Sequence, residues 1–509
     1  MPLQYDAFDQ TIGRTNAILT EHETKHVKAR LHARINQVHR IDSHLKNAQG
    51  LLTNREMVLE DRAGLVTLIG HYLVAVAPHK RLPTELWQRI FQYVCLGYDQ
   101  AAPRVANPPI LLCRICSSWK YIAENMPELW KSLHFYMEKE YNPSQKLQAA
   151  RTFFSRAGNL PLSLTLSDTD SNSAINFVQE VIVPFSRSFK YLHLVLSSSQ
   201  IKDLLSLPLG SLDSLEELHV VLLIGVTPVS ILPAWKPPFT VFSPSSKLRR
   251  LRIQLTPIVV PHIFRLPWHC LETFRCDSSI QADDCHELLL SCQALRKLHV
   301  RVFGIKYSAT PRVEIPLPNL THFSVHLCDE ESYDLFFLPL ILPTLQSLMI
   351  YNYIGLRWSS GMYDSLVERS GCRVEELYLG TFIAVSQDIS RLLERTPTLR
   401  SMTLSHTAPL TDELLMRIGR CEVGAALEEL FLKNPQPLDP VLSMLEAREG
   451  KFALIMESDG TWTSTSPLKF VEKRVHPIDS VAHAARIQRL RDIGIGISLI
   501  EIAEDYFQL

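Results

Sequence analysis

One short pattern recurs along most of this 509-residue chain after residue 138: apolar-x-x-apolar-x-apolar. Its ten copies begin at Phe189, Leu215, Leu248, Leu271, Leu295, Leu320, Leu345, Val374, Leu399 and Leu427. The starts lie about 26 residues apart on average, which is within the range of leucine-rich repeats. Each copy has the pattern of one short strand, and its leucines can be buried only if neighbouring copies stack against it. The pattern therefore predicts an α/β array of repeats with parallel strands.

Helical segments between the copies, such as DDCHELLLSC and TDELLMRIG, are expected on the convex side of this array, with the strands on its concave face. The asparagine that usually closes the turn after such a strand is absent from nearly all copies. Prolines such as Pro316, Pro318, Pro343 and Pro397 stand between copies instead. We therefore expect an irregular leucine-rich-repeat solenoid over residues 138–509.

The end of the chain differs from the repeats before it. Residues 481–509 predict one helix (VAHAARIQRLRDIG) and a last strand (ISLIEI), an atypical unit that suits a capping repeat. Before this unit, the stretch GKFALIMESDGTWTSTS within residues 450–480 has the pattern of a hairpin or a loop insertion. Nothing in the stretch assigns it a role.

Residues 1–76 show a different periodicity. From about residue 12 the stretch lacks proline, and apolar residues recur in it every seven positions: Leu31, Val38, Leu45, Leu52 and Leu59. This spacing predicts one long amphipathic helix with the seam of a short coiled coil. Either the seam joins copies of the chain, or it packs on the rest of the molecule. Arg34 and Arg55 interrupt the companion row and favour the second alternative.

Residues 77–137 begin with a basic hinge and the helical segment LPTELWQRIFQYV. The apolar residues of this segment form two adjacent rows: Leu86, Ile90 and Val94 at every fourth position, and Trp87 with Phe91. One small packing partner cannot cover so wide an apolar arc. A second helical segment, ILLCRICSSWKYIAE, follows a proline-rich loop at residues 99–109.

The order and spacing of these residues resemble the F-box motif. The matching positions are Leu82, Pro83, Glu85, Leu86, Ile90, Leu112, Ile115, Cys116 and Trp119, followed by Pro127, Leu129 and Trp130. The proline-rich insertion at 99–109 departs from the motif, because many F-boxes have a shorter turn there. Together with the preceding heptad helix, the segment RAGNLPLSLTL and the repeats, the chain resembles the large F-box families of mushroom-forming fungi.

This resemblance implies a three-helix F-box that docks on the Skp-type adaptor of a cullin-based (SCF) ubiquitin ligase. The repeats are then expected to hold a protein substrate. The expected adaptor-binding residues are Leu82, Pro83, Glu85, Leu86, Ile90, Leu112, Ile115, Cys116 and Trp119. A helical unit of this size cannot close its own core, and an exposed apolar face is a sticky patch unless a partner covers it. Two alternatives remain: the apolar rows pack only on other parts of the chain, or the protein is an F-box scaffold without ligase-linked turnover.

The concave face of the repeats is the expected substrate surface. Alternation along each strand sends the residues between the leucines to that face. These residues are Arg250, Arg252, Arg275, Lys297, His299, Arg301, Met349, Tyr351, Glu376 and Tyr378. The cations form a basic patch that favours an acidic or phosphorylated segment, and the methionine and tyrosines offer an apolar anchor beside it. The alternative is a solvated face, or internal pairing with Asp277 and nearby acids.

Enzymatic chemistry has little support in the sequence. His22, Glu23 and His26 match the zinc-protease pattern HExxH, with His32 at the place of a third ligand. The glycine that would turn the chain before that ligand is Ala29, and on a continuous helix the three histidines cannot meet at one ion. The CxxC pair at residues 113–116 lacks the second pair that a zinc site needs. The sequence also contains no phosphate-binding loop and no nucleophile elbow. We expect no enzyme activity, no metal and no cofactor.

Composition narrows the partner classes. The net charge of −1 gives no reason to expect nucleic acid or an anionic membrane as a partner. The ten cysteines lack the dense spacing of a disulfide scaffold, which indicates reduced thiols in the cytoplasm or nucleus. No segment has the pattern of a secretory signal or a membrane span.

Overall fold

The computed structural model divides the chain into two units, one of residues 1–135 with 142–163 and one of residues 136–141 with 164–509. Each unit is described by itself. The structure describes residues 11–14, 18–47, 55–96, 108–137, 143–168, 177–222, 241, 247–254, 266–304, 313–329, 332–352, 355–405, 410–433, 437–448, 453–456, 462–465, 470–475 and 482–501. Most of the proline-rich insertion, and Leu52 of the heptad series, lie outside these ranges.

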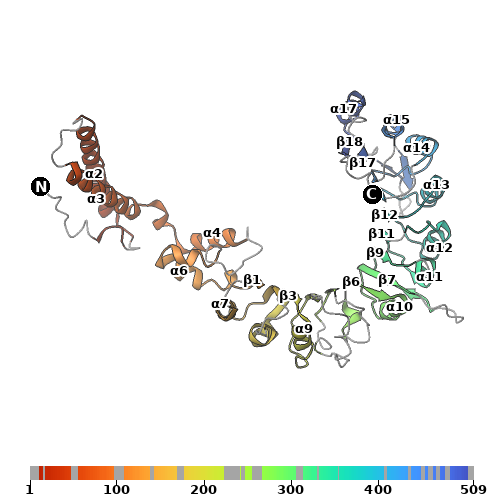
Figure 1. Ribbon diagram of the computed structural model, residues 1–509, viewed down its shortest axis with the longest axis horizontal. Coiled ribbons are helices and arrows are strands. Elements are labelled where there is room, and N and C mark those ends of the chain that lie inside the picture. The colour runs from red at the N-terminus through yellow and green to blue at the C-terminus, as the bar shows by residue number, and fades with distance from the viewer. Residues whose placement is uncertain are drawn as a thin grey trace. The chain divides into compact units, whose positions relative to one another are not determined.

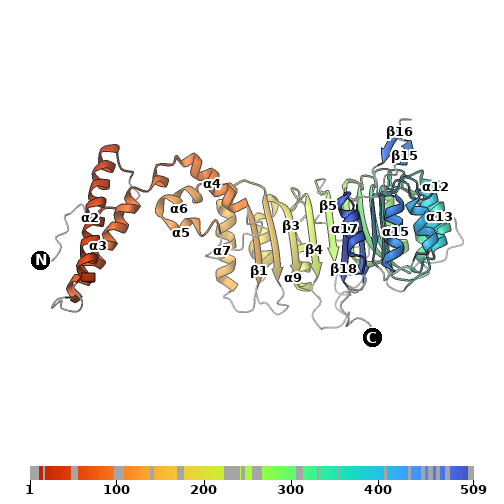
Figure 2. The ribbon, with the colours of Figure 1, turned by 90° about the horizontal axis from the view of Figure 1, so that it is seen from above.

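The first unit starts with two helices, α2 (Glu21–Asn47) and α3 (Arg55–Ala75), which lie side by side (Figures 1 and 2). Val27 and Leu31 of α2 pack with Leu68 and Tyr72 of α3 in one buried cluster. An ion pair of 2.6 Å joins Arg62 Nε to Asp42 across the same two helices. The expectation of one long helix is therefore wrong, because the apolar face of α2 is covered by a later helix of the same chain.

A group of shorter helices follows. They are the 3-10 turn η1 (Pro78–Arg81), α4 (Thr84–Leu96), α5 (Leu112–Ile115), α6 (Ser117–Glu124), the 3-10 turn η2 (Pro127–Leu129) and α7 (Pro143–Arg156). The expected second helix is broken at Cys116, whose backbone is extended (φ −158°, ψ 166°). The Cys116 Sγ accepts a hydrogen bond from the backbone N–H of Trp119, so this thiol caps α6.

Most of the second unit is built on a 14-stranded sheet, whose first two strands begin among the residues of the first unit and whose strands follow chain order. They are β1 (Ser132–Met137), β2 (Leu162–Asp168), β3 (Phe189–Leu196), β4 (Glu217–Leu222), β5 (Arg250–Gln254), β6 (Thr273–Gln281), β7 (Lys297–Phe303), β9 (His322–Leu327), β11 (Ser347–Asn352), β12 (Glu376–Gly380), β13 (Ser401–Ser405), β14 (Glu429–Leu432), β17 (Phe470–Val475) and β18 (Gly496–Glu501). From β3 to β18 every neighbouring pair is parallel. Each of the ten predicted copies forms one of these strands, so the expected α/β class with a parallel sheet is confirmed.

Helices connect the strands and lie along the outer side of the curved row of strands (Figure 1). They include α9 (Ser198–Leu205), α10 (Ala282–Leu290), α11 (Ser332–Phe337), α12 (Ser360–Ser370), α13 (Ser386–Arg395), α14 (Asp412–Gly419), α15 (Leu438–Arg448) and α17 (Ala484–Asp492). Short elements fill the gaps: the π-turn η3 (Val178–Ile182), α8 (Val183–Phe185), η4 (Ser186–Ser188), η7 (Trp268–Cys270), and the strand pair β8 (Ile315–Pro316) and β10 (Leu340–Ile341). The last helix and strand lie where the sequence predicts them.

The stretch within residues 450–480 contains an antiparallel strand pair, β15 (Ala453–Met456) with β16 (Trp462–Thr465). This pairing agrees with the hairpin alternative. The pair is separate from the large sheet.

The core lies between the sheet and its helices. Successive strands align their apolar residues in register, for example Leu298 with Phe323 and Phe323 with Leu348. These side chains are all at most 2% exposed. We call the other side of the sheet, which carries the alternate residues of each strand, the open face. The register of the core therefore fixes which side chains are neighbours on the open face.

Arg448, at the end of α15, is an unusual member of this interior because only 2% of it is exposed. Its guanidinium donates hydrogen bonds to the backbone carbonyls of Ile418, Gly424, Ala425 and Leu427. Burial lowers the pKa of Arg448. One side chain thus satisfies the carbonyls of the segment that leads from α14 into β14.

We expect Arg448→Met to destabilise the protein by about 2–4 kcal/mol, because it leaves several buried carbonyls without donors. Urea unfolding followed by far-UV circular dichroism measures this loss. The matched control is Arg400→Met, which removes an exposed 3.4 Å pair with Glu428 and should cost less than about 1 kcal/mol. Equal effects of the two substitutions would show that the carbonyls do not depend on Arg448.

Candidate functional site

The outward side of α4 carries a row of exposed apolar residues. Leu86, Ile90 and Val94 are 44%, 38% and 37% exposed and follow one another at helical spacing. Trp87 and Phe91 point the other way and are buried. We call Leu86, Ile90 and Val94 the α4 row. It is an apolar surface that the described residues of its own unit leave open to solvent.

Aromatic packing holds α4 in place. The ring centroids of Trp87 and Trp119 lie 4.6 Å apart, and those of Phe91 and Trp119 lie 5.2 Å apart. His79 contacts Trp87 edge-on at 6.1 Å. Trp119 comes from α6, so this cluster joins α4 to α6. The α4 row is thereby presented by a helix with a fixed orientation.

The residues expected to bind the adaptor fall into two groups. Pro83, Glu85, Leu86, Ile90 and Ile115 are exposed, and Leu82 is half-buried. The other residues serve the interior: Leu112 is 4% exposed, Cys116 caps α6, and Trp119 lies in the aromatic cluster. In this conformation the first group offers apolar or charged surface to a partner, and Leu82, Cys116 and Trp119 are half-buried.

The expected substrate residues come together on the open face of the larger unit. Arg252, Arg275, His299, Ser324, Met349 and Tyr378 occupy one register row across β5 to β12. A neighbouring row aligns Arg301, His326 and Tyr351. Lys297 aligns with His322 and then with Ser347 in a third row. The alternation predicted from the sequence is therefore correct in its placement.

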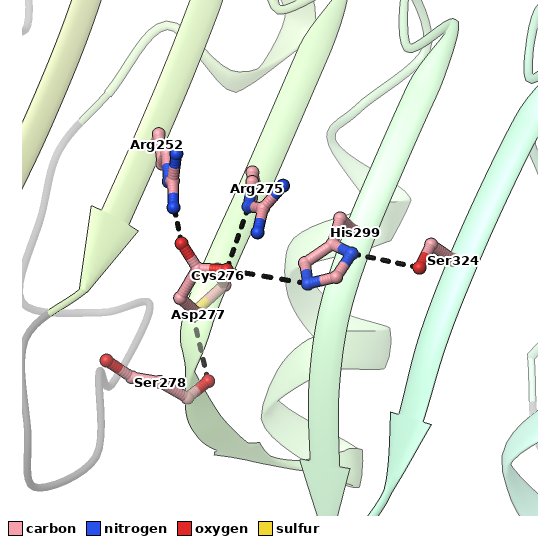
Figure 3. Close-up of polar contacts among 7 residues, drawn as sticks. All are labelled: Arg252, Arg275, Cys276, Asp277, Ser278, His299 and Ser324. Atoms are coloured by element: carbon pink, nitrogen blue, oxygen red, sulfur yellow. Dashed lines mark hydrogen bonds and ion pairs between the residues drawn. The ribbon is translucent and has the colours of Figure 1, made fainter. Parts of the chain in front are cut away.

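Asp277 changes the charge of this surface. It lies where the register of β6 shifts between Arg275 and Ser279, which is an irregularity of the strand. Its carboxylate accepts hydrogen bonds from Arg252 Nε at 2.7 Å and Arg275 Nε at 2.8 Å, and lies 3.5 Å from His299 (Figure 3). Burial alone would raise the pKa of Asp277, but the two guanidinium hydrogen bonds outweigh it and lower that pKa. Arg252 and Arg275 are thus paired internally, which is one of the two alternatives left open by the sequence.

Other cations of the expected patch differ in their surroundings. Arg250 pairs with Glu217 at 2.6 Å. Lys297 is exposed, and no carboxylate pairs with it in the described part of the chain. The net positive charge of the expected basic patch is therefore smaller than the number of its cations suggests. Lys297 is an exposed cation of this patch that lacks a carboxylate partner within the described ranges.

Aromatic rings continue the open face toward β12. The rings of His326 and Tyr351 stack at 4.2 Å, and those of Tyr351 and Tyr378 lie 4.6 Å apart. The Tyr351 hydroxyl donates to the sulfur of Met349 at 3.8 Å. Lys433 Nζ lies 5.5 Å from the Tyr378 ring centroid. Met349, Tyr351 and Tyr378 thus form a continuous apolar and aromatic surface.

A groove of about 480 Å³ lies between the cationic and aromatic parts of the open face. It is lined by Arg275, Lys297, His299, His322, Ser324, His326, Ser347, Met349 and Tyr351, among others. The sequence interpretation omitted His322, Ser324, His326 and Ser347. The strand alternation that placed the arginines would have placed them too, but small or neutral side chains gave no charge signal.

Three histidines on the open face have lowered pKa values. Burial, followed by the charges of His193 and Arg252, lowers the pKa of His219 to about 3. Burial and Arg275 lower the pKa of His299 to about 4. Burial, with His299 and Arg301, lowers the pKa of His326 to about 4. His219, His299 and His326 therefore add hydrogen-bonding groups and flat rings to the open face, and no cationic charge at neutral pH.

The zinc-protease pattern has a structural explanation. Its residues all lie on the continuous helix α2. The Glu23 carboxylate accepts hydrogen bonds from the N–H and the hydroxyl of Thr20, and the Glu23 N–H donates to the Thr20 hydroxyl. These reciprocal bonds are a capping box, which the sequence TEHE signals. Among the described residues, no group of three or more histidine, cysteine or acidic side chains is placed to hold a metal ion.

Comparisons with known proteins give no family. No protein-family model matches the chain, and a search of curated proteins finds no similar sequence. A separate observation is that none of the helices in the described part of the chain has the length and apolar character needed to cross a membrane.

We expect the free energy of unfolding to fall as the pH falls from about 6.5 toward 4. The folded state holds the pKa of His219, His299 and His326 below the value in an unfolded chain, so unfolding takes up protons in that window. Asp277 has a lowered pKa, so its contribution is lost only at lower pH. Urea unfolding at a series of pH values measures the slope.

The double variant His299→Gln, His326→Gln should have a shallower slope than the wild type. The control is His269→Gln, which changes an exposed histidine outside the open face. An unchanged slope in the double variant would show that these rings do not govern the acid sensitivity.

Proposed function

We propose that the protein is an F-box substrate-recognition adaptor of a cullin-type ubiquitin ligase. In this proposal residues 77–137 dock on the Skp-type adaptor through the α4 row, and the sheet unit, as an irregular leucine-rich-repeat solenoid, holds a protein substrate. The observation that carries the proposal is the α4 row itself. Three apolar side chains are exposed on a helix whose opposite face is fixed by an aromatic cluster.

The energetics of exposure support a partner at this surface. Burying apolar surface contributes roughly 25 cal/mol of favourable free energy per Å². Docking that buries the exposed Leu, Ile and Val of the α4 row would therefore be stabilised by several kcal/mol. Ile115, which is 52% exposed, comes from the same segment and is also a matching position of the motif. An apolar surface on a rigid helix suits a groove on a partner protein.

The sheet unit supports the second half of the proposal. One strand per copy, a parallel register in chain order and helices on the other side are the features of repeat arrays that bind proteins along their strands. The open face presents paired arginines, the exposed Lys297 and an aromatic surface, which suit a peptide segment of a protein. We propose a non-enzymatic role in the cytoplasm or nucleus, without a metal, cofactor, nucleic acid or membrane.

The decisive experiment is co-purification with the Skp-type adaptor. Leu86→Ala with Ile90→Ala should abolish co-purification, because truncating central apolar side chains of such a contact costs a few kcal/mol. Both residues are well exposed, so circular dichroism and the melting temperature should change little. The matched control is Leu59→Ala with Val66→Ala, which shortens exposed side chains on α3 and should leave co-purification intact.

Undiminished co-purification of the Leu86, Ile90 double variant would contradict docking through the α4 row.

A second measurement separates the adaptor from the scaffold alternative. The level of a ligase-engaged adaptor rises when the proteasome is blocked, and that of a scaffold does not. Self-association through the first unit stays a prediction, and light scattering of the purified chain measures it.

A further inference from the structure

We infer that the groove on the open face binds an extended acidic peptide segment, with its anionic side chain at Lys297 and an apolar side chain on Met349 and Tyr351. This inference rests on the proposed function, because it names the class of substrate that the sheet unit would hold. It narrows the basic patch expected from the sequence to Lys297, away from Arg252 and Arg301. Four observations on the groove carry it.

The first observation is the unpaired charge of Lys297. The guanidinium groups of Arg250, Arg252 and Arg275 have carboxylate partners at 2.6 to 2.8 Å. Lys297 has none within the described ranges and lies at the wall of the groove. An anion gains little at the paired arginines, because it would have to displace Asp277 or Glu217. At Lys297 it displaces only water.

The second observation is a buried hydroxyl without a partner. Ser347 lines the groove and is 2% exposed, and its Oγ has no hydrogen-bond partner among the described residues. A buried polar group without a partner costs about 1–3 kcal/mol in the free protein. A peptide N–H or C=O in the groove would satisfy it. The unpaired hydroxyl therefore points to a hydrogen-bonding ligand in this groove.

The third observation gives the ligand a direction. On one side of Lys297, its register row continues through His322 and Ser347 to Glu376, which aligns with Ser347 on the next strand. Glu376 would repel an anion at the β12 end. The acidic side chain therefore lies at the β7 end, and the ligand crosses the strands toward β11.

The fourth observation sets the spacing within the peptide. Lys297 and Met349 are separated by two strand spacings and by two residues along the strand, a diagonal of roughly 12 Å. An extended chain covers that distance in about three or four residues. Met349 and Tyr351 offer the kind of apolar and aromatic contact that anchors a peptide. The groove thus favours an acidic residue followed three or four positions later by an apolar one.

The test uses three fluorescein-labelled decapeptides of glycine and serine with leucine at position seven. Position four carries glutamate, phosphoserine or glutamine. We expect the full-length chain to bind both anionic probes at least tenfold more tightly than the glutamine probe. The ratio between the glutamate and phosphoserine probes shows which anion the groove prefers. Equal binding of all three probes overturns the inference.

Two variants locate the binding. Lys297→Glu should weaken the anionic probes roughly ten- to a hundredfold, whereas Lys202→Glu, an exposed lysine on α9, should not change them. Ser347→Ala should weaken binding severalfold without lowering the melting temperature, because it removes an unsatisfied hydroxyl. Its control is Ser278→Ala, another buried hydroxyl without a partner among the described residues, which lies outside the groove. Anionic-probe binding that survives Lys297→Glu overturns the assignment.

Failure of this inference can be told apart from failure of the proposed function. Lys297→Glu should retain co-purification with the Skp-type adaptor, because Lys297 lies in the other unit. Loss of probe selectivity with retained co-purification overturns the peptide site and leaves the adaptor proposal standing. Selective probe binding without co-purification supports the peptide site and removes its place in a ubiquitin ligase.

Discussion

A single strand of this chain cannot bury its own apolar side chains, and the larger unit depends on that constraint. Leu298 is buried only because Phe323 and its own neighbours lie beside it and a helix lies over it. Since side chains alternate along a strand, the register that aligns these buried residues also aligns Lys297 with His322 and His299 with Ser324. The open face is thus a consequence of core packing. A shift of one residue in β6, β7, β9 or β11 would therefore disrupt both the core and the groove.

The irregularity at Asp277 shows how a small departure from this order redistributes charge. Where the register shifts, one carboxylate reaches two guanidinium groups on neighbouring strands and an imidazole on a third (Figure 3). Partial burial of a carboxylate is unfavourable alone, and the guanidinium hydrogen bonds offset it. The consequence is a centre in which one carboxylate offsets the charge of one of two arginines, beside an exposed lysine without a carboxylate partner. Counting basic residues along the strands would have placed the strongest positive potential at the arginines.

The sequence predicted those parts of the fold that depend on local periodicity. All ten repeated copies are strands, and the helices at Ala282–Leu290 and Asp412–Gly419 lie where their segments predicted them. The sequence did not predict how the N-terminal helices pack, because a seven-residue period is equally consistent with one long helix and with two helices that face each other. In the structure Leu59 is exposed and is not part of a buried seam. The sequence also missed the break at Cys116, where a thiol serves as a helix cap. On the open face it placed the residues correctly and left pairing with Asp277 open. Whether that pairing forms, and whether the Ser347 hydroxyl finds a partner, depends on contacts between neighbouring strands that the sequence does not show.

The two proposed binding surfaces differ in their physics. The α4 row is apolar, so docking there gains from removal of water and changes little with salt. The groove offers Lys297, the two uncharged rings of His299 and His326, and the unsatisfied Ser347 hydroxyl, so we expect binding there to fall as salt screens Lys297. Such a difference suits an adaptor, whose attachment to the ligase should outlast each substrate. Because Arg250, Arg252 and Arg275 already have carboxylate partners, we expect most affinity for the proposed peptide to come from the apolar anchor at Met349 and Tyr351. The charge at Lys297 would then select among peptides rather than hold them.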